Sequence, residues 1–364
     1  MIENYTIPAH YLSPVAIPPG ETIREIIESR GMSQLELSRR LGKPHQAVNE
    51  IVNGKKAITK DTAILLERVL GLPVHFWVAL EQNYQTCLAR QKEKSELEEQ
   101  ISTFREFPYR ELVKRGFLKD YKSQVDQIRE SLTWLGVGSF EALITQTNQM
   151  VIKYRRSPRF DLPLLKLAAW LRIGELEAER VPGSFFDKKA LKNSLSELRE
   201  LTTRPVDTWI QQIINFGIRC GVIFVFVPEF RSFPVVGVTR WFRKRPTIQL
   251  TLRGRRADIF WFTLFHEIGH VLLHDSKDVF IDIESPEYSN RWEAEADRFA
   301  ADTLIPPNFY ADILDSGIVH GTQIENWAQE IGIAPGILLG RLQHDDVIPP
   351  NRYNDLHQKL EWDN

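Results

Sequence analysis

The stretch FHEIGHVLLH, residues 265–274, carries two histidines four positions apart, with a glutamate directly after the first. In a helix, positions four apart lie on one face, so His266 and His270 would present two imidazole nitrogens to one point. Glu267 would stand about 100° around the same turn. Two neutral imidazoles are good zinc ligands, and an adjacent carboxylate can take a proton from water that the metal acidifies. The stretch therefore predicts a catalytic zinc site.

The motif has a plainer alternative, which is a buried helix whose histidines are hydrogen-bonded core residues. By chance alone, the three fixed letters appear in roughly one chain of this length in a hundred. The flanking runs IFWFTLF and VLL make such a helix apolar on nearly every side. Histidines buried there need polar partners, and a metal ion supplies one directly. We therefore favour the metal site.

A catalytic zinc ion also needs a third protein ligand. The run WEAEAD offers Glu293, 23 residues after the second histidine, with Asp297 one turn later on the same face. We expect Glu293 to bind the metal and Asp297 to accept a hydrogen bond from the far nitrogen of a ligating histidine. Glu295 points about 200° away and is the runner-up ligand. His274 lies about 6 Å beyond the second histidine along the axis, so we expect it to line a cleft or to be structural.

The residue composition changes after Pro205. A helix is expected first, through Phe216. Three runs rich in β-branched and aromatic residues then predict a small sheet, namely GVIFVFVPEF (221–230), VVGVTRWF (235–242) and PTIQLTL (246–252). We expect an extended substrate to align along the edge of the third strand through main-chain hydrogen bonds. Further helices follow the motif, in WEAEADRFAADTL, IENWAQEIGI and PGILLGRL.

The N-terminal part reads as a compact bundle of four or five short helices, because Gly31, Gly42, Gly54 and Gly71 recur between apolar-periodic segments. Ser33 can cap one helix that runs through Leu41, and a turn falls at Gly42 and Lys43. A second helix is expected from Pro44 to Val52. This arrangement is typical of a helix-turn-helix that binds DNA.

A local basic cluster supports that interpretation. The whole chain holds 46 Lys and Arg against 48 Asp and Glu, so its net charge of -2 offers no general attraction to nucleic acid. Residues 39–60, however, hold six Lys or Arg and a single acid, Glu50, for a local charge of +5. The alternative is a small helical bundle for protein contacts. We favour DNA because the turn, the helix lengths and the basic cluster coincide.

The expected DNA contacts fall into two classes. Phosphates would be met by Gln34, Lys43, Lys55 and Lys56, and base edges in the major groove by His45, Gln46 and Asn49. The packing face of the second helix would be Ala47, Val48, Ile51 and Val52. Because one such module offers few contacts, we expect a homodimer on an inverted repeat of double-stranded DNA.

The remaining sequence bounds the organisation. Residues 91–100 carry mixed charge without Gly or Pro, which suits a solvated helix that links domains, and helical periodicity continues to about residue 200 without recognisable chemistry. We expect three parts: a helix-turn-helix domain at 1–90, a helical connector at 91–200 and a metallopeptidase domain at 201–364. The fold class is mainly α with a small α+β domain.

The composition also suggests a compartment. The N-terminus lacks a basic segment followed by an apolar one, and no apolar run approaches the ~18 residues of a membrane span. Only two cysteines occur, Cys87 and Cys220, without ligand-like spacing, so neither a disulfide framework nor a thiolate metal site is indicated. We expect a soluble cytoplasmic protein without a membrane partner.

Two resemblances agree with these interpretations. FHEIGHVLLH, together with EAEADRFAADTLIP, resembles the ImmA/IrrE-type zinc metallopeptidase domain, over about residues 201–345. The resemblance implies a minimal zincin-like fold, related to thermolysin-type peptidases, with His266, His270 and Glu293 as zinc ligands and Glu267 as general base and acid. Ile305 and the proline after it stand where the family usually has Met-Pro. Some relatives cleave a repressor in response to stress, while others have no demonstrated activity.

The N-terminal segment MSQLELSRRLGKPHQAVNEIVNGKKAITKDTAILLERVLG resembles Xre/Cro-type helix-turn-helix repressors, and with its flanks the HigA type of antidote, over about residues 14–90. Together the resemblances imply a DNA-binding regulator with an antitoxin-like N-terminus and a zinc endopeptidase domain that acts on a regulatory protein or a toxin. The alternative is a non-enzymatic antitoxin whose peptidase-like domain binds zinc, a toxin or a signal. Stress sensing through zinc or small-molecule occupancy is compatible with either.

Overall fold

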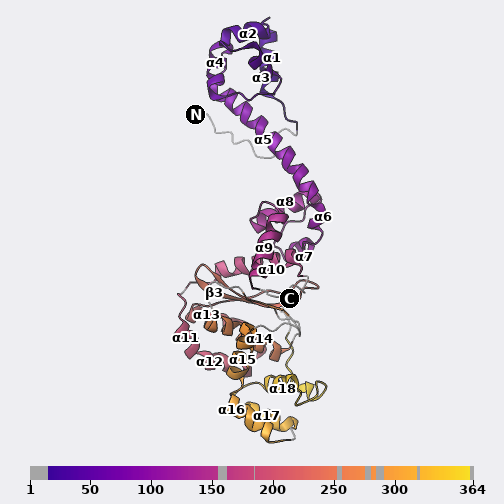
Figure 1. The fold of residues 1–364 in the computed structure, drawn as a ribbon, viewed down its shortest axis with the longest axis vertical. Helices are drawn as coiled ribbons and strands as arrows, with labels where there is room; N and C mark the ends of the chain where they lie inside the picture. Colours follow the sequence, from indigo (N-terminus) through magenta and orange to yellow (C-terminus); the bar gives the residue numbers. More distant parts are fainter. Residues whose placement is uncertain are drawn as a thin grey trace. The chain divides into compact units, whose positions relative to one another are not determined.

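The computed structural model describes residues 15–154, 162–183, 185–251, 256–274, 280–283, 291–317 and 320–360. The chain divides into two compact units, the first comprising Met1–Ser102 with Ser123–Ile128 and the second Thr103–Lys122 with Arg129–Asn364. The fold is mainly helical with one small sheet, as predicted (Figure 1). None of the helices in the described ranges is both long and apolar enough to cross a membrane.

The first unit is built from helices with short connections: α1 (Pro19–Ser29), α2 (Gln34–Leu41), α3 (His45–Val52), α4 (Lys60–Leu70) and α5 (Val74–Glu99). The predicted pair of helices is confirmed. The Ser33 side chain accepts a hydrogen bond from the backbone N–H of Glu36 at 3.1 Å and caps α2, which ends at Gly42 in the left-handed conformation. This tight turn fixes how α3 leaves α2.

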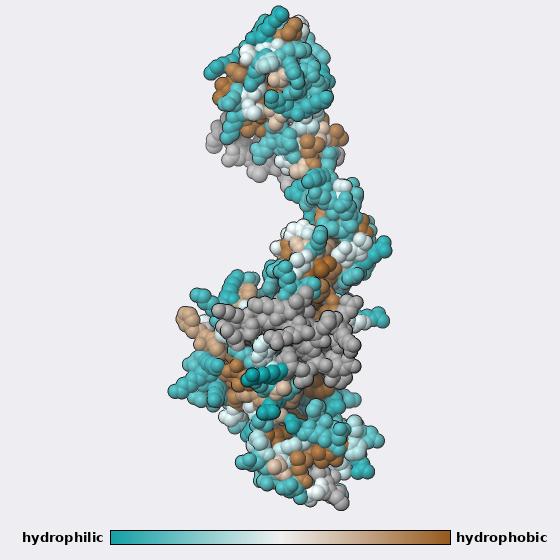
Figure 2. All heavy atoms as spheres, viewed as in Figure 1, coloured by the Kyte–Doolittle hydropathy of each residue, from teal (hydrophilic) through white to brown (hydrophobic). Residues whose placement is uncertain are grey.

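The core of the first unit is apolar and well shielded. Leu37, Val52, Leu66 and Trp77 are fully buried in it, and Val48 and Ile51 pack there as predicted, whereas Ala47 is only half-buried. Hydrophilic residues cover most of the face that Figure 2 shows for this unit. The second half of α5 is mostly exposed and confirms the predicted solvated helix.

The middle of the chain is helical, as predicted. Its elements are α6 (Ile101–Phe104), α7 (Tyr109–Lys114), α8 (Gln124–Leu135), α9 (Phe140–Tyr154), α10 (Leu164–Arg180), α11 (Lys188–Asn193), α12 (Leu195–Glu200) and the 3₁₀ turn η2 (Leu201–Thr203). Next come α13 (Val206–Cys220), which Gly221 ends in a left-handed conformation, and the sheet. The predicted helix after Pro205 therefore runs one turn beyond Phe216.

The sheet has four strands: β1 (Ile223–Phe226), β2 (Val235–Phe242), β3 (Arg245–Leu250) and β4 (Phe280–Ile283), in the order β1-β3-β2-β4. β1 pairs with β3 in parallel, and the other pairs are antiparallel. The three predicted strands are confirmed, and β4 is an addition. The expectation that the third strand offers an edge to substrate is wrong, because β3 pairs with β1 on one side and β2 on the other.

Helices cover both faces of this sheet (Figure 1). On one face lies α10, whose Trp170 indole N–H donates to the Val227 carbonyl at 3.3 Å and whose Trp170 carbonyl accepts from the Gln249 side chain at 2.7 Å. The buried Arg240 guanidinium donates to the Leu171 carbonyl at 2.8 Å and to Glu175 at 3.0 Å. These polar contacts fix the sheet against α10.

On the other face lie α13 and α14 (Ala257–Leu273). After β4 the chain continues through α15 (Arg291–Leu304), α16 (Pro307–Asp315), α17 (Gly321–Ile331), α18 (Pro335–His344) and the 3₁₀ turn η3 (Asn354–Leu356). Helix α14 contacts both α15 and α18, and the stacked aromatic pair Trp209 and Phe260 packs α13 against it. The opening motif thus lies on the central helix of the second unit.

Candidate metal centre

Helix α14 carries the histidine motif and is almost wholly buried. Its 17 residues are mostly apolar, and His266, Glu267 and His270 are 4%, 0% and 2% exposed. The helix ends at Leu273, because His274 adopts an extended backbone conformation. Three ionisable side chains are therefore held inside a protein core, where each requires a polar partner.

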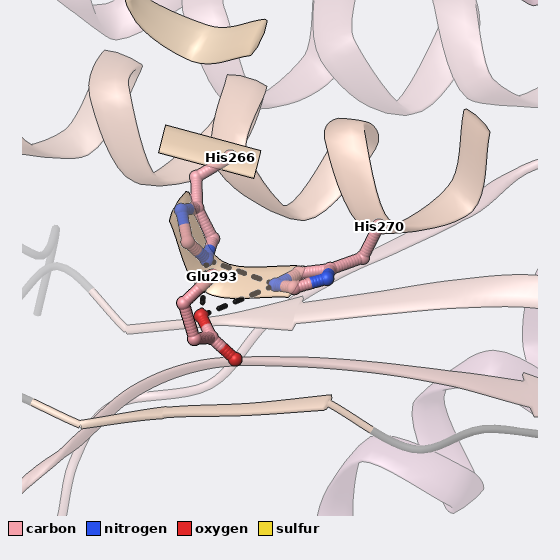
Figure 3. Close-up of side chains that lie close together, drawn as sticks. All are labelled: His266, His270 and Glu293. Carbon is pink, nitrogen blue, oxygen red and sulfur yellow. Dashed lines mark hydrogen bonds and ion pairs between the residues drawn. The ribbon is translucent and has the colours of Figure 1, made fainter. Parts of the chain in front are cut away.

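The three predicted ligands come together (Figure 3). His266 Nε2 lies 3.1 Å from Glu293 Oε2 and 2.9 Å from His270 Nε2, and His270 Nε2 lies 3.5 Å from the same carboxylate oxygen. Glu293 enters from the first turn of α15, and its side chain is 12% exposed. The structure thus brings the motif on α14 and the glutamate on α15 to one point.

The donor set fits a zinc ion. Atoms bound at about 2.0–2.1 Å in a tetrahedron lie roughly 3.3 Å from one another, which is close to the three separations here. The far nitrogen of His266, Nδ1, lies 2.8 Å from Asp297 Oδ1; if Nδ1 donates to this carboxylate, the lone pair on Nε2 faces the Glu293 carboxylate. Nε2 of His266 and the Glu293 carboxylate would then both be acceptors, and a cation has to lie between them, either a shared proton or a metal ion.

The other acidic and histidine candidates lie outside the cluster of His266, His270 and Glu293. As expected, Asp297 forms a hydrogen bond with the far nitrogen of His266, while Glu295 accepts hydrogen bonds from Arg291 and His274. His274 contacts the far nitrogen of His270, with 2.9 Å between the two Nδ1 atoms. The runner-up ligand therefore lies outside the three-ligand cluster, and so does the third histidine.

Burial and pairing shift the pKa values of two of the three clustered residues, His270 and Glu293. Burial lowers the pKa of His270 to about 4, although its hydrogen bond with Glu293 acts in the opposite direction. Burial opposes ionisation of Glu293, but its hydrogen bonds with His266 and His270 outweigh this and lower its pKa to about 2. At neutral pH the site therefore offers a neutral imidazole and a carboxylate, which are the forms that bind zinc.

Glu267 points from α14 toward strand β2. The Thr239 hydroxyl donates to its carboxylate and lies 3.2 Å from its carbonyl oxygen. A Cβ atom added to Gly237 would lie only 2.2 Å from Glu267 Oε1. Residues 237 and 239 lie on the same face of the strand, so one makes space for the carboxylate and the other binds it.

Gly237 and Thr239 were not among the candidates from sequence, and neither was Phe280, whose ring stacks on His270 at a centroid distance of 4.0 Å. A glycine inside a strand often marks the close approach of another group, so VVGVTRWF did contain a signal. It did not identify the group. Phe280 belongs to β4, which was itself missed.

A second glycine, Gly269, lies where α14 and α15, which carry the three clustered residues, approach each other closely. A Cβ atom added to Gly269 would lie 3.1 Å from Phe299 and 3.2 Å from the Cα atom of Ala296. Helix α15 therefore packs closely against α14 at the motif, with Ala296 and Ala300 fully buried. This packing brings Glu293 within reach of both histidines.

The predicted DNA-contact residues lie around α2 and α3. His45, Gln46, Asn49, Lys55 and Lys56 are exposed, whereas Gln34 and Lys43 are half-buried. The Asn49 amide donates to Gln34 at 3.4 Å, and its oxygen accepts from the Asn53 amide at 2.7 Å. Gln46 donates to Glu50 at 3.0 Å. Asn53 was not predicted, yet it orients a candidate base-contacting side chain.

Comparison with known proteins matches both parts of the chain. The helix-turn-helix family model matches residues 23–77, and the model of the IrrE N-terminal-like domain matches residues 223–343. Virulence-associated protein I of Dichelobacter nodosus is 34% identical over 91 residues, which cover 25% of this chain and 84% of that protein. The chain belongs to this helix-turn-helix family. It also carries an IrrE N-terminal-like domain, which contains the three-ligand cluster.

Solved structures similar to this helix-turn-helix protein include an addiction module antidote of the HigA family from Coxiella burnetii. It is 33% identical, with 23% of this chain and 92% of that chain covered and a TM-score of 0.22. The Pseudomonas aeruginosa antitoxin HigA with the higBA promoter is 30% identical, with 23% and 94% covered and a TM-score of 0.22.

Proposed function

We propose that the chain is a DNA-binding, antitoxin-like regulator whose IrrE-like domain is a zinc-dependent endopeptidase. The observation that carries the enzymatic part is the convergence of His266 Nε2, His270 Nε2 and Glu293 Oε2. A further carboxylate, that of Glu267, follows the first histidine in the same buried region and is not one of the three clustered residues. Metal binding alone does not require that group, so its presence favours catalysis over simple binding.

The roles of the chain's residues follow from ordinary peptide hydrolysis. A zinc ion, when bound, would polarise the substrate carbonyl and acidify the attacking water. Glu267 would accept a proton from that water as its oxygen attacks the carbonyl carbon, and would pass the proton to the amine as the C–N bond breaks. Thr239 and the space at Gly237 would hold the carboxylate in place.

An extended substrate would pair with β4 instead of the strand first expected. Within the described ranges, β4 pairs with β2 alone, and its other edge would supply the main-chain hydrogen bonds to the substrate. Phe280 on β4 also stacks on His270, which places this strand beside the metal ligands. The substrate class that fits is an unfolded or extended segment of a protein.

A second candidate function is sensing without cleavage, and a cavity supports it. The cavity has a volume of about 450 Å³, lies between α14, α15 and α18, and is lined by residues that include Phe262, Asp297, Ile337 and Arg341. This volume is typical of small-molecule sites. Because Asp297 also holds His266, a ligand there would reach the metal site through one hydrogen bond.

The test of the proposed function is a zinc assay beside a cleavage assay on the full chain. Candidate substrates are its own N-terminal unit and a toxin encoded beside it. We expect one zinc ion per chain and cleavage of at least one candidate. Full zinc occupancy without cleavage under any inducing condition favours the sensing function, and a folded protein that binds no zinc overturns both.

For the N-terminal unit we propose sequence-specific binding to double-stranded DNA as a cytoplasmic homodimer on an inverted repeat. The support is the exposed polar face of α3 beside the basic residues that follow it. Asn49 is held by Gln34 and Asn53, which lowers the entropy that it loses when it contacts a base.

Replacing Lys55 and Lys56 with Ala should weaken binding to all sequences and reduce the slope of log K against log salt concentration by about four, because each protomer of the dimer loses two phosphate contacts. Replacing Gln46 with Ala should instead change base preference, by about 1–3 kcal/mol at one position. Titration of the full chain into operator and random duplexes at several salt concentrations separates these effects. Equal salt slopes for the wild type and the lysine variant would contradict the phosphate assignment.

A further inference from the structure

The nitrogen that faces away from the site, Nδ1, has a hydrogen-bond partner in both ligating histidines, but the two partners differ. His266 donates directly to the Asp297 carboxylate. His270 instead contacts another histidine, with its Nδ1 2.9 Å from His274 Nδ1, and His274 Nε2 lies 3.3 Å from Glu295 Oε2. The far nitrogen of the second histidine, Nδ1, is thus linked to a carboxylate through an intermediate ring. We propose that His274 and Glu295 are positioning residues that orient His270 for zinc; this inference rests on the proposed zinc site.

The hydrogen-bond directions along this chain are determined by its two ends. His270 needs the lone pair of Nε2 for the metal, so its proton lies on Nδ1 and is donated to His274 Nδ1. His274 then carries its own proton on Nε2 and donates it to Glu295 Oε2. The other carboxylate oxygen, Oε1, accepts from Arg291 Nε at 2.8 Å. Every contact has one donor and one acceptor with both rings neutral.

The end of helix α14 makes this arrangement possible. In a continuing helix, His274 would point along the same face as His270, one turn farther on. Its backbone is extended instead, with φ -113° and ψ 172°, while its N–H still donates to the His270 carbonyl at 3.2 Å. The side chain stays buried, at 4% exposure, and packs near Phe280, with 5.0 Å between the ring centroids. His274 is therefore a buried residue that packs beside His270 and Phe280.

This arrangement has a chemical consequence for the metal. A hydrogen bond to the far nitrogen fixes the tautomer and the orientation of a ligating imidazole, and raises its basicity. Loss of such a partner typically weakens metal binding 10–100-fold. In the proposed arrangement His274 donates one proton, from Nε2, so it would orient His270 without adding charge beside the buried ligands. Glu295, at the protein surface, completes the chain.

The experiment uses the full chain and compares His274→Leu with His274→Asn. The Leu side chain fills the space but accepts no hydrogen bond, while the Asn oxygen can take the place of His274 Nδ1 as the acceptor for His270. We expect zinc affinity, from competition with a chromophoric chelator, to fall about 10–100-fold in the Leu variant and to recover largely in the Asn variant. His75→Leu, at an exposed histidine on α5, is the matched control and should leave the affinity unchanged.

A second measurement takes its result from the wild type and uses His274→Asn only to assign the His274 signal. In the zinc-loaded wild type, ¹⁵N spectra of labelled histidines should show His270 protonated at Nδ1 and His274 at Nε2, with the second signal absent from His274→Asn. A proton on His274 Nδ1, or equal zinc affinity in the wild type and the Leu variant, would overturn the positioning role alone. A folded wild type that binds no zinc would overturn the proposed site as well.

Discussion

Replacing Glu267 with Gln is expected to leave zinc binding intact and to lower the rate of peptide cleavage by about 10²–10⁴-fold. The amide has nearly the shape of the carboxylate, and its oxygen can still accept the hydrogen bond from Thr239, so the fold should persist. It cannot take a proton from water at neutral pH. The measurement is fragment formation from candidate substrates, followed by mass spectrometry, at equal zinc occupancy.

Glu325→Gln is a suitable control, because it makes the same change at an exposed position on α17 of the same unit. It should cleave at the wild-type rate. If Glu267→Gln cleaves as fast as this control, Glu267 is not the base, and its carboxylate serves only to bind Thr239. Loss of zinc from the Gln variant would instead indicate that the carboxylate supports the metal site.

Acidification should destabilise the second unit of the metal-free protein between pH 6.5 and 4, by about 3 kcal/mol. The sign follows from His270, because burial lowers its pKa from the ordinary value of 6.5 to about 4 on folding. Below pH 6.5 the unfolded chain binds a proton that the folded protein does not take up until about pH 4. The contribution of His270 to the free energy of unfolding therefore has its full value above pH 6.5 and declines as the pH falls from 6.5 to 4. Glu293, with its pKa lowered to about 2, extends the decline below pH 4.5.

Urea unfolding in the presence of a chelator measures this effect. Tryptophan fluorescence mainly reports the second unit, because Trp77 is the only one of the nine tryptophans in the first. His270→Gln removes the titrating group, so its stability should vary much less between pH 6.5 and 4. The same pH dependence in the variant and the wild type would show that other groups cause the decline.

The clustering of His266, His270 and Glu293 could be predicted from the sequence because its geometry is mostly local. His266 and His270 share a face through helical spacing alone, and Glu293 and Asp297 repeat that spacing on the next ligand-bearing helix. The partners of the site could not be predicted in this way. The contact between Glu267 and Gly237 joins a helix and a strand 30 residues apart, and the pairing of His274 with Glu295 depends on where α14 ends.

The fold shows the same division. Alternating β-branched and aromatic residues indicated three strands, since strand formation leaves a local pattern. The order of the strands in the sheet could not be predicted. β1 pairs with β3, although β2 lies between them in the sequence, and such pairing depends on the packing of whole elements. Strand β4 is only four residues long, which is too short for a clear periodic signal.

The close packing of α14 and α15 at Gly269 has a consequence for the lifetime of the protein in the cell. A zinc ion bound by His266, His270 and Glu293 would cross-link these two helices, and would bind the folded chain only. At a free zinc concentration 1,000 times the dissociation constant, the folded state would gain about 4 kcal/mol. Proteases act mainly on opened chains, so zinc-starved molecules would be degraded first. The abundance of this protein would then follow the zinc supply, whether or not it cleaves a substrate.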